Sequence, residues 1–229
     1  CFMDVVIVSR TDDDRLRAMT QNCIDTLMKS EEIDFRAFMI EANENVSYDC
    51  EMLRQSGEIN YNRCLNMGLE RCNSEFITFC NNDLIFMKGW LSSHLDVFKQ
   101  RPDIHSLSPK CHFWHGEEYS KHTSFTNGIY EGYRTKFEFT GWCFTVRSLV
   151  FDKIGRFDES VSFWYSDTIF ATQLKRSRMK HALNANSHVI HLFNQSHHLC
   201  NDTELKSLTT GQKENFEMRK KYLNSPKLI

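Results

Sequence analysis

The first third of the sequence alternates between predicted strands and helices. Residues 3–9, 35–40 and 76–80 are short runs of apolar and β-branched residues, the pattern of buried strands. Apolar side chains at helical spacing separate these runs, first at Leu16, Met19, Cys23, Ile24 and Leu27 and then over residues 60–72. This order predicts an α/β fold with a mostly parallel central sheet flanked by helices.

Polar residues follow each of the three predicted strands, at 9–14, 41–45 and 81–83. Because the carboxyl ends of parallel strands meet at one edge of a sheet, these segments should converge. A cleft of nucleotide size at that edge is therefore the predicted binding site.

The tripeptide Asn81-Asn82-Asp83 is the most informative of these strand ends. Its carboxylate and amide oxygens suit Mg²⁺ or Mn²⁺ together with a substrate phosphate. The same tripeptide also favours a simple turn, which is the alternative interpretation. Its place at the end of a buried strand favours ligand binding.

Composition narrows the class of protein. The 229 residues, 41% hydrophobic and 25% charged, are typical of one globular domain, and a net charge of −2 gives no general attraction to nucleic acid or membranes. The nine cysteines are scattered, without a Cys-x-x-Cys pair, which favours reduced thiols. With no apolar run long enough to span a membrane and no leader pattern, a cytoplasmic location is expected.

The second half of the chain is less regular. Residues 111–136 should form a long irregular loop on the acceptor side of the site. The other expected elements are helices at 89–101, 167–176 and 213–222, a short helix that starts at Ser148, and strands at 104–108, 136–146 (interrupted at Gly141-Trp142) and 181–190.

Taken in order, these signals resemble a known family. The segments that carry the resemblance are the opening strand 5–9, Asn62-x-x-x-Asn66-x-Gly68, Asn81-Asn82-Asp83, Gly89-Trp90-Leu91, residues 141–144, residues 151–158, Ser166-Asp167 and His188-Val-Ile-His191. Over residues 3–198 the chain looks like a GT-A-fold glycosyltransferase of the inverting family 2 type. The resemblance implies a single domain over 1–229, with a nucleotide-sugar half at 1–88 and an acceptor half with the closing helix at 89–229.

The resemblance also implies a metal site and a base. Asp83 stands where the family places its metal-binding Asp-x-Asp, and His191 at a C-terminal ligand position, so a divalent cation, Mn²⁺ or Mg²⁺, is expected. Asn81 departs from the usual carboxylate, which puts manganese dependence in question. Since a separation of three residues places His188 and His191 on opposite strand faces, we prefer His191. Asp167 matches the general base; the alternative is that it only caps a helix.

Substrate contacts follow from the same resemblance. The expected donor-binding residues, for a UDP-sugar, are Ser9, Thr11, Glu41, Asn62, Arg63, Asn81 and Asn82. Gly141 and Trp142 are expected on the acceptor side, where an exposed indole would stack on a sugar or base. A buried core tryptophan is the alternative for Trp142.

The acceptor and the oligomeric state stay open. The acceptor is a glycan, a protein or a modified DNA base, the last as in phage-type enzymes that glycosylate hydroxymethylated bases. The DNA acceptor is supported by two basic runs, 175–181 and 219–221. Basic residues are also favourable at the C-termini of helices, which is the alternative interpretation of both runs. A non-catalytic binder of sugar nucleotides or glycans is a further alternative, supported by Asn81. A nucleotidyltransferase is disfavoured because no glycine follows the first strand.

Overall fold

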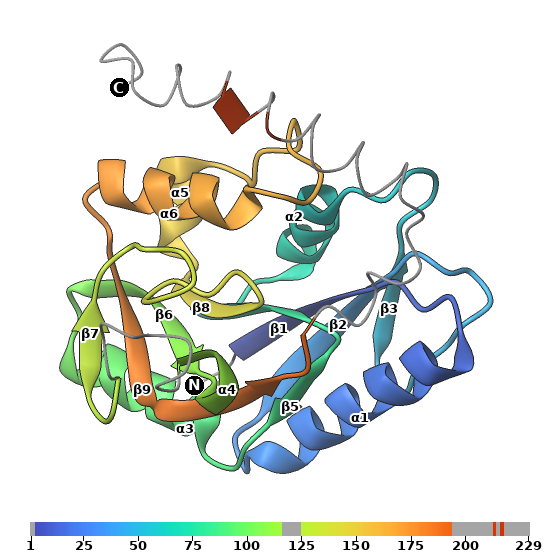
Figure 1. The fold of residues 1–229 in the computed structure, drawn as a ribbon, viewed down its shortest axis with the longest axis horizontal. Helices are drawn as coiled ribbons and strands as arrows, with labels where there is room; N and C mark the ends of the chain where they lie inside the picture. Colours follow the sequence, from blue (N-terminus) through green and yellow to red (C-terminus); the bar gives the residue numbers. More distant parts are fainter. Residues whose placement is uncertain (1–2, 116–124, 194–212, 214–215, 218–229) are drawn as a thin grey trace.

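The computed structural model describes residues 3–115, 125–193, 213 and 216–217. In that part of the chain a nine-stranded sheet lies between two layers of helices (Figure 1). The strands are β1 Met3–Ser9, β2 Phe35–Glu41, β3 Glu51–Arg54, β4 Phe76–Asn81, β5 Leu84–Phe86, β6 Ile104–Lys110, β7 Ile129–Glu131, β8 Cys143–Arg147 and β9 Lys180–His191. The helices are α1 Asp14–Ser30, α2 Tyr61–Arg71, α3 Trp90–Gln100, α4 His112–His115, α5 Leu149–Ile154 and α6 Ser166–Arg176.

The N-terminal half of the sheet is parallel, as the sequence predicts. Its order is β3-β2-β1-β4, and every pair in it is parallel. Every residue of β1 is buried, which is expected for a parallel strand covered by helices on both faces. The register pairs Ser9 with Glu41 and Val8 with Asn81, so the three polar strand ends do converge on one edge.

The α/β fold with a central sheet and flanking helices is confirmed, and the C-terminal half of the sheet adds antiparallel pairs. β8 is antiparallel to both β4 and β6, and β5 and β7 are antiparallel to β9, so the whole sheet is mixed. The expected strand 136–146 is confined to Cys143–Arg147. Residues before it form turns, in which the Glu138 carboxylate accepts a hydrogen bond from the Arg134 backbone N–H (3.1 Å).

The predicted loop 111–136 contains two short elements, α4 and β7, among its described residues. The sequence patterns did not predict these two elements, nor strands β3 and β5. All four are only three or four residues long, too short for a periodic pattern. The expected closing helix at 213–222 and the basic run 219–221 lie outside the described residues, apart from 213, 216 and 217.

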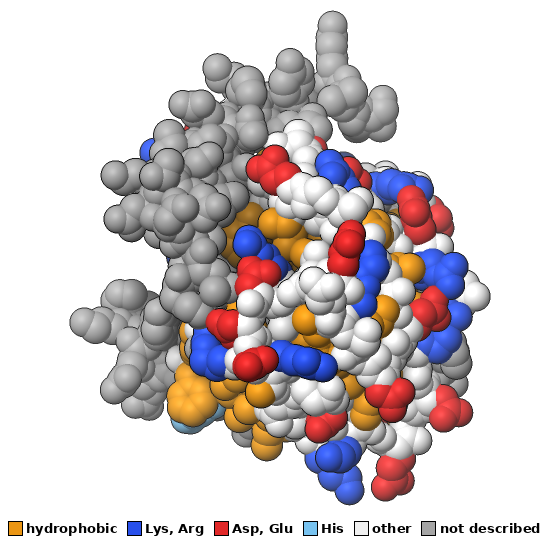
Figure 2. Space-filling view, turned by 90° about the vertical axis from the view of Figure 1, so that its right-hand side faces the viewer, with side chains coloured by type: hydrophobic (Ala, Val, Ile, Leu, Met, Phe, Trp, Pro, Cys, Tyr) orange, Lys and Arg blue, Asp and Glu red, His pale blue; other side chains and the backbone are white. Residues whose placement is uncertain are grey.

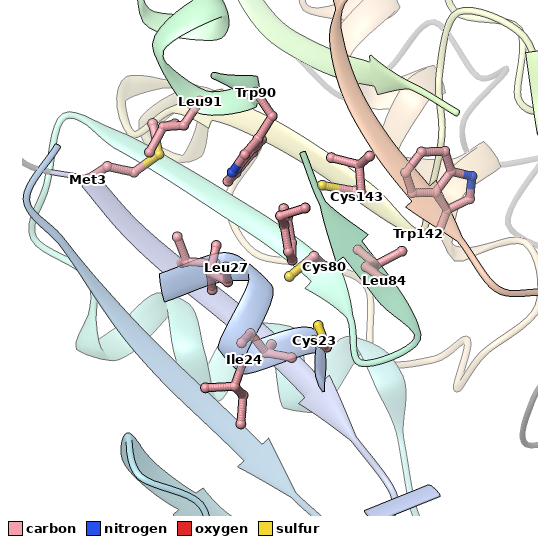
Figure 3. Packing of buried hydrophobic residues seen from close by; sticks show 14 of the residues in the cluster. Met3, Cys23, Ile24, Leu27, Cys80, Leu84, Trp90, Leu91, Trp142 and Cys143 are labelled. Carbon is pink, nitrogen blue, oxygen red and sulfur yellow. The ribbon is translucent and has the colours of Figure 1, made fainter. Parts of the chain in front are cut away.

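The helices cover the two faces of the sheet. α1 and α3 lie on one face, and α2, α5 and α6 lie on the other (Figure 1). On the first face Ile24 and Leu27 of α1 and Trp90 of α3 pack over Cys80 of β4 (Figure 3). Burial raises the pKa of the nearby Cys23 thiol to about 12, so this thiol stays protonated and unreactive in the core.

Helix α2 explains the spaced motif of Asn62, Asn66 and Gly68. The Asn66 side chain donates to the Phe157 carbonyl (3.0 Å) and accepts from the Phe157 N–H (3.0 Å), which ties α2 to the segment before α6. A Cβ on Gly68 would lie 2.2 Å from Val6 Cγ1 of β1. The glycine is therefore required for the close approach of α2 to the sheet.

The surface carries mixed charges. On the face drawn in Figure 2, Lys and Arg alternate with Asp and Glu and do not gather into a patch of one sign. Exposed ion pairs link Asp103 to Arg101 (2.9 Å) and to Lys180 (2.8 Å). Within the described part of the chain, no helix has the length and hydrophobicity needed to cross a membrane.

We predict that Gly68→Ala destabilises the fold. Alanine normally favours a helix interior over glycine, but the contact with Val6 forces strain of roughly 1–3 kcal/mol. The measurement is the free energy of unfolding in denaturant. The double variant Val6→Ala/Gly68→Ala should lose no more stability than Val6→Ala alone, because the smaller side chain removes the clash. A Gly68→Ala variant as stable as the unmodified chain would contradict this account of the motif.

Candidate active site

Asp83 and His191 lie side by side at the carboxyl edge of the sheet. β5 pairs with β9 in antiparallel register, with Leu84 opposite His191. This register places His191 Nε2 3.3 Å from Asp83 Oδ2, and the two residues are only 8% and 7% exposed. The structure thus brings together the two residues expected to bind metal. His188 is exposed on the same strand.

The pair has unused polar atoms. Asp83 Oδ1 and His191 Nδ1 are buried and have no hydrogen-bond partner among the described residues. Buried polar atoms normally have partners, so these two atoms are available to bind a ligand. A carboxylate oxygen and an imidazole nitrogen together suit Mn²⁺ better than Mg²⁺, which prefers oxygen ligands. No group of three or more His, Cys, Asp or Glu in the described chain could hold a metal ion, so such a site would need further oxygens from substrate and water.

Trp142 covers this pair. Its ring stacks on that of His191, with centroids 5.2 Å apart and planes 16° apart. Trp142 is 6% exposed, and its Nε1–H has no partner among the described residues. The residue is therefore mostly buried, as the alternative interpretation expected, and it also forms a wall of the neighbouring cavity.

A cavity of about 180 Å³ adjoins Trp142. Four residues expected in the site from separate parts of the sequence line it: Asn81, Gly141, Trp142 and Asp167. Its remaining lining residues are Tyr61, Leu65, Trp114, Lys136, Thr140, Phe144, Phe157, Phe163, Trp164, Tyr165, Ser166 and Phe170. The cavity thus has mostly aromatic walls, with a small number of polar groups, as in many ligand sites.

Asp167 lies in the first turn of α6, at the wall of the cavity. Its Oδ1 accepts hydrogen bonds from Thr168 N (2.7 Å) and Thr168 Oγ1 (3.2 Å), so the residue does stabilise the helix start. Oδ2 accepts no hydrogen bond from the described residues. Burial raises the pKa of Asp167, while the Thr168 bonds and the charge of Lys136 oppose that rise.

Two backbone features bring Asp167 to the cavity. Tyr165, the residue before α6, has φ 67°, a left-handed conformation that is uncommon outside glycine. On the facing segment, a Cβ on Gly141 would lie 2.7 Å from Asp167 Cβ. Gly141 therefore makes room for the Asp167 side chain.

The expected donor residues Ser9, Thr11, Glu41 and Asn82 form one buried network with Tyr48. Thr11 donates to Glu41 from its backbone N–H (3.0 Å) and its hydroxyl (2.9 Å), and the Tyr48 hydroxyl lies 2.9 Å from Thr11 Oγ1. Asn82 Nδ2 donates to Ser9 Oγ (3.0 Å). Glu41 is fully buried, so this network lies below the surface and holds the loops at the edge of the sheet in place.

Asn62 and Arg63 occupy a different place. The Asn62 amide donates to the Asp158 carbonyl (2.7 Å) and accepts from the Ser166 hydroxyl. Arg63 is exposed and lies 3.4 Å from Glu159. Both residues hold the segment before α6, and donor binding by them stays a prediction.

Sequence reasoning missed the parts that Tyr61, Tyr48 and Lys136 play here. The Tyr61 hydroxyl donates to Asn81 Oδ1 (2.9 Å), although its position in a helical stripe indicates only a core residue. Lys136 lines the cavity with φ 74°. No local pattern marks these residues, because their contacts come from distant parts of the sequence.

Comparison with known proteins identifies the class. The chain resembles S. aureus TarS residues 1–349 (TM-score 0.60, 11% identity) and GalNAc-T7, solved with UDP, GalNAc and Mn²⁺ (TM-score 0.65, 10% identity). Each comparison covers 82% of this chain, but only 58% of the TarS chain and 43% of the GalNAc-T7 chain. The fold is therefore that of the GT-A glycosyltransferases.

The family is more specific than the fold. The sequence model of glycosyl transferase family 2 matches residues 39–155, just over half of the chain. The chain belongs to glycosyl transferase family 2. The match includes Asp83 and Gly141 but ends before Asp167 and His191. No curated protein sequence matches the chain significantly.

We predict that Gly141→Ala lowers the kcat of the folded protein at least tenfold and also lowers its stability, because Asp167 Cβ cannot move far without its helix. The added methyl group would meet Asp167 Cβ and displace the carboxylate from the cavity, and small displacements of a reacting group are costly. Kinetics and a thermal melt of the same sample separate the two effects. A folded variant with unchanged kcat would show that the position of Asp167 is not critical.

Proposed function

We propose that this chain is a metal-dependent, inverting glycosyltransferase that moves a sugar from a nucleotide-sugar donor to an acceptor hydroxyl. The observation that carries the proposal is the position of Trp142. The ring of Trp142 stacks on the ring of His191, which is part of the Asp83–His191 pair. Trp142 also lines the cavity that contains Asp167. The proposed cation-binding pair and the Asp167 carboxylate thus both lie near one residue, an arrangement that suits transfer from a nucleoside diphosphate.

Asp83 and His191 are the proposed metal ligands. A bound Mn²⁺ or Mg²⁺ would act as a Lewis acid toward the departing diphosphate. The orphaned atoms Asp83 Oδ1 and His191 Nδ1 support this role. The UDP and Mn²⁺ in the GalNAc-T7 structure support a UDP-sugar and manganese for this chain. Ser9, Thr11, Glu41 and Asn82 shape the proposed donor edge.

Asp167 is the proposed general base. Its carboxylate would accept the proton of the acceptor hydroxyl while that oxygen attacks the anomeric carbon. The bond between the sugar and the diphosphate oxygen breaks on the opposite side, which inverts the anomeric configuration. Two observations support this role: Oδ2 accepts no hydrogen bond from the described residues, and Asp167 lines the cavity. Lys136, which lines the same cavity, favours the ionised carboxylate.

The aromatic wall supports a glycan as acceptor. Phe163 and Trp164 line the cavity and are 44% and 37% exposed, and partly exposed aromatic rings are a common surface for binding sugars. Lys136 is the one basic side chain among the described lining residues. A DNA acceptor would need several phosphate contacts, so the cavity gives it less support.

We predict that Asp83→Ala removes Mn²⁺-dependent binding of UDP. Asp83 is the negatively charged member of the proposed metal-binding pair. Without it the cation binds more weakly, and the diphosphate loses its counter-charge. Calorimetric titration of UDP with and without Mn²⁺ measures the effect, expected to be at least tenfold. Asp96→Ala, at an exposed position on α3, is the matched control and should bind as the unmodified chain does. Unchanged Mn²⁺-dependent affinity in Asp83→Ala would exclude the assignment.

We predict that Asp167→Asn lowers kcat by about 10²–10⁴-fold, the usual contribution of a positioned base. UDP affinity and stability should change little, since the amide oxygen still accepts the Thr168 hydrogen bonds. A general base must be ionised to accept a proton. Because burial raises the pKa of Asp167, the midpoint of the acid-side decline in activity should lie above 3.8, the ordinary carboxyl pKa.

The pH profile and the product supply the controls for Asp167. The residual activity of Asp167→Asn should lack the acid-side decline that the unmodified chain shows. NMR of the glycoside product should show inverted configuration. If the variant instead unfolds with activity per folded molecule intact, Asp167 only caps the helix, and a retained configuration would exclude the inverting mechanism.

A further inference from the structure

The imidazole of His191 is packed among three aromatic rings. The Trp142 indole is nearly parallel to it, with planes 16° apart and centroids 5.2 Å apart, and lies beside the end of β9 (Figure 3). The Phe193 ring is 4.9 Å from the imidazole and the Trp114 ring is 6.2 Å from it. Trp114 and Phe193 also stack on each other, at 5.3 Å. Helix α4, the turn before β8 and the residues after β9 thus meet around one imidazole ring.

The backbone around these rings sets their positions. The Trp142 carbonyl accepts a hydrogen bond from the Asn81 N–H (2.9 Å), which fixes the turn before β8 against the end of β4. The Trp114 indole N–H donates to the Lys136 carbonyl (2.7 Å). Phe193 has φ 57°, a left-handed conformation that is rare for a bulky residue. Strained backbone of this kind is concentrated at functional sites, so the arrangement indicates more than ordinary core packing.

The imidazole lacks the protein hydrogen bond that usually orients a metal-binding histidine. Such a histidine normally donates its second ring N–H to a carboxylate, a backbone carbonyl or water. In His191, Nε2 faces Asp83 Oδ2 at 3.3 Å, and Nδ1 is buried with no partner among the described residues. Apart from its contact with Asp83, the ring is therefore held by aromatic packing, and Trp142 is the neighbour most nearly parallel to it.

We propose that Trp142 is a positioning residue that holds the His191 imidazole in the orientation for a metal ion, and that it thereby favours Mn²⁺ over Mg²⁺. The inference rests on the proposed function and deepens it, because it assigns a structural cause to metal selectivity. Mg²⁺ prefers oxygen ligands, whereas an oxygen and an imidazole nitrogen together suit Mn²⁺. Asp83 offers an oxygen to either ion, so the nitrogen of His191 is the group that discriminates between them.

Substitutions can separate positioning from general packing. Trp142→Leu keeps a buried apolar side chain but removes the aromatic face, whereas Trp142→Phe keeps a smaller aromatic ring. Trp142→Met takes the place of Trp142→Leu if that variant does not fold, because its longer side chain fills more of the space. Phe98→Leu is the matched control, since Phe98 is also buried and stacks on Phe76 (4.8 Å), and neither of these residues lines the cavity.

The experiment measures the affinity of each variant for UDP with Mn²⁺, with Mg²⁺ and without a divalent cation. Dividing the affinity with a cation by the affinity without it isolates the contribution of the metal site from any direct contact of Trp142 with the nucleotide. We expect Trp142→Leu to lower this ratio about tenfold for Mn²⁺, as is typical when a group that orients a metal ligand is lost. For Mg²⁺ the ratio should fall by less than about threefold, because Mg²⁺ prefers oxygen ligands.

The other variants show whether the aromatic ring is responsible. Trp142→Phe should retain most of the Mn²⁺ ratio, because a ring still faces the imidazole. Phe98→Leu should melt at a lower temperature than the unmodified chain and keep both ratios unchanged. A purely structural role of Trp142 would instead lower the Mn²⁺ and Mg²⁺ ratios together.

A double-mutant cycle tests whether Trp142 acts through His191. In His191→Ala no imidazole remains to be positioned, so adding Trp142→Leu should cause little further loss in the Mn²⁺ ratio, and the two substitutions should be clearly non-additive. Pulsed electron paramagnetic resonance of the complex with Mn²⁺ and UDP adds a direct readout. It should show nitrogen coupling to the ion in the unmodified chain and weaker coupling in Trp142→Leu.

Three results would overturn the inference. The first is a Mn²⁺ ratio in Trp142→Leu that is unchanged, or that falls equally with the Mg²⁺ ratio, which would make Trp142 a packing residue only. The second is full additivity of Trp142→Leu and His191→Ala. Both results would leave the proposed function standing. The third is an unmodified chain that does not bind UDP, or binds it equally with and without a cation, which would overturn the proposed metal dependence and the inference together.

Discussion

The pairing of β9 with its neighbours is the constraint on which the site depends. This strand is parallel to β6 and antiparallel to β5 and β7, so it joins the irregular second half of the chain to the sheet. Its last residue, His191, lies opposite Leu84, which brings an imidazole beside Asp83. A shift of one residue in this register would turn His191 to the other face. The candidate metal pair is thus a direct consequence of strand register.

Helix α2 fixes the other half of the site. Asn62 and Asn66 bond to the segment that leads into α6, and Gly68 lets the helix approach β1. From the same helix, Tyr61 reaches Asn81 at the end of β4. One helix therefore sets the position of the Asp167 helix and also contacts the end of β4. In this chain, the spaced asparagines and the glycine act through packing and backbone hydrogen bonds.

The site keeps polar atoms that the fold itself does not satisfy. Asp83 Oδ1, His191 Nδ1 and Trp142 Nε1 are buried without partners in the described chain, whereas the Ser9–Thr11–Glu41 network is well bonded. Leaving buried polar groups unpaired lowers stability, typically by about 1–3 kcal/mol each. Such a cost is expected where a ligand completes the hydrogen bonding. At this edge of the sheet, the bonded network is therefore structural, and the unpaired atoms are available to a ligand.

The sequence by itself determined the alternating half of the fold and the residues at its edge. Buried strands and amphipathic helices follow from short-range periodicity, so β1, β2, β4, α1 and α2 were predictable, and with them the convergence of Ser9, Glu41 and Asn81. Only the tertiary structure decided the antiparallel half of the sheet, the contact of His191 with Asp83 and the bond from Tyr61 to Asn81. These depend on pairing and packing between residues far apart in the chain, and no local pattern records which distant partner a side chain will meet.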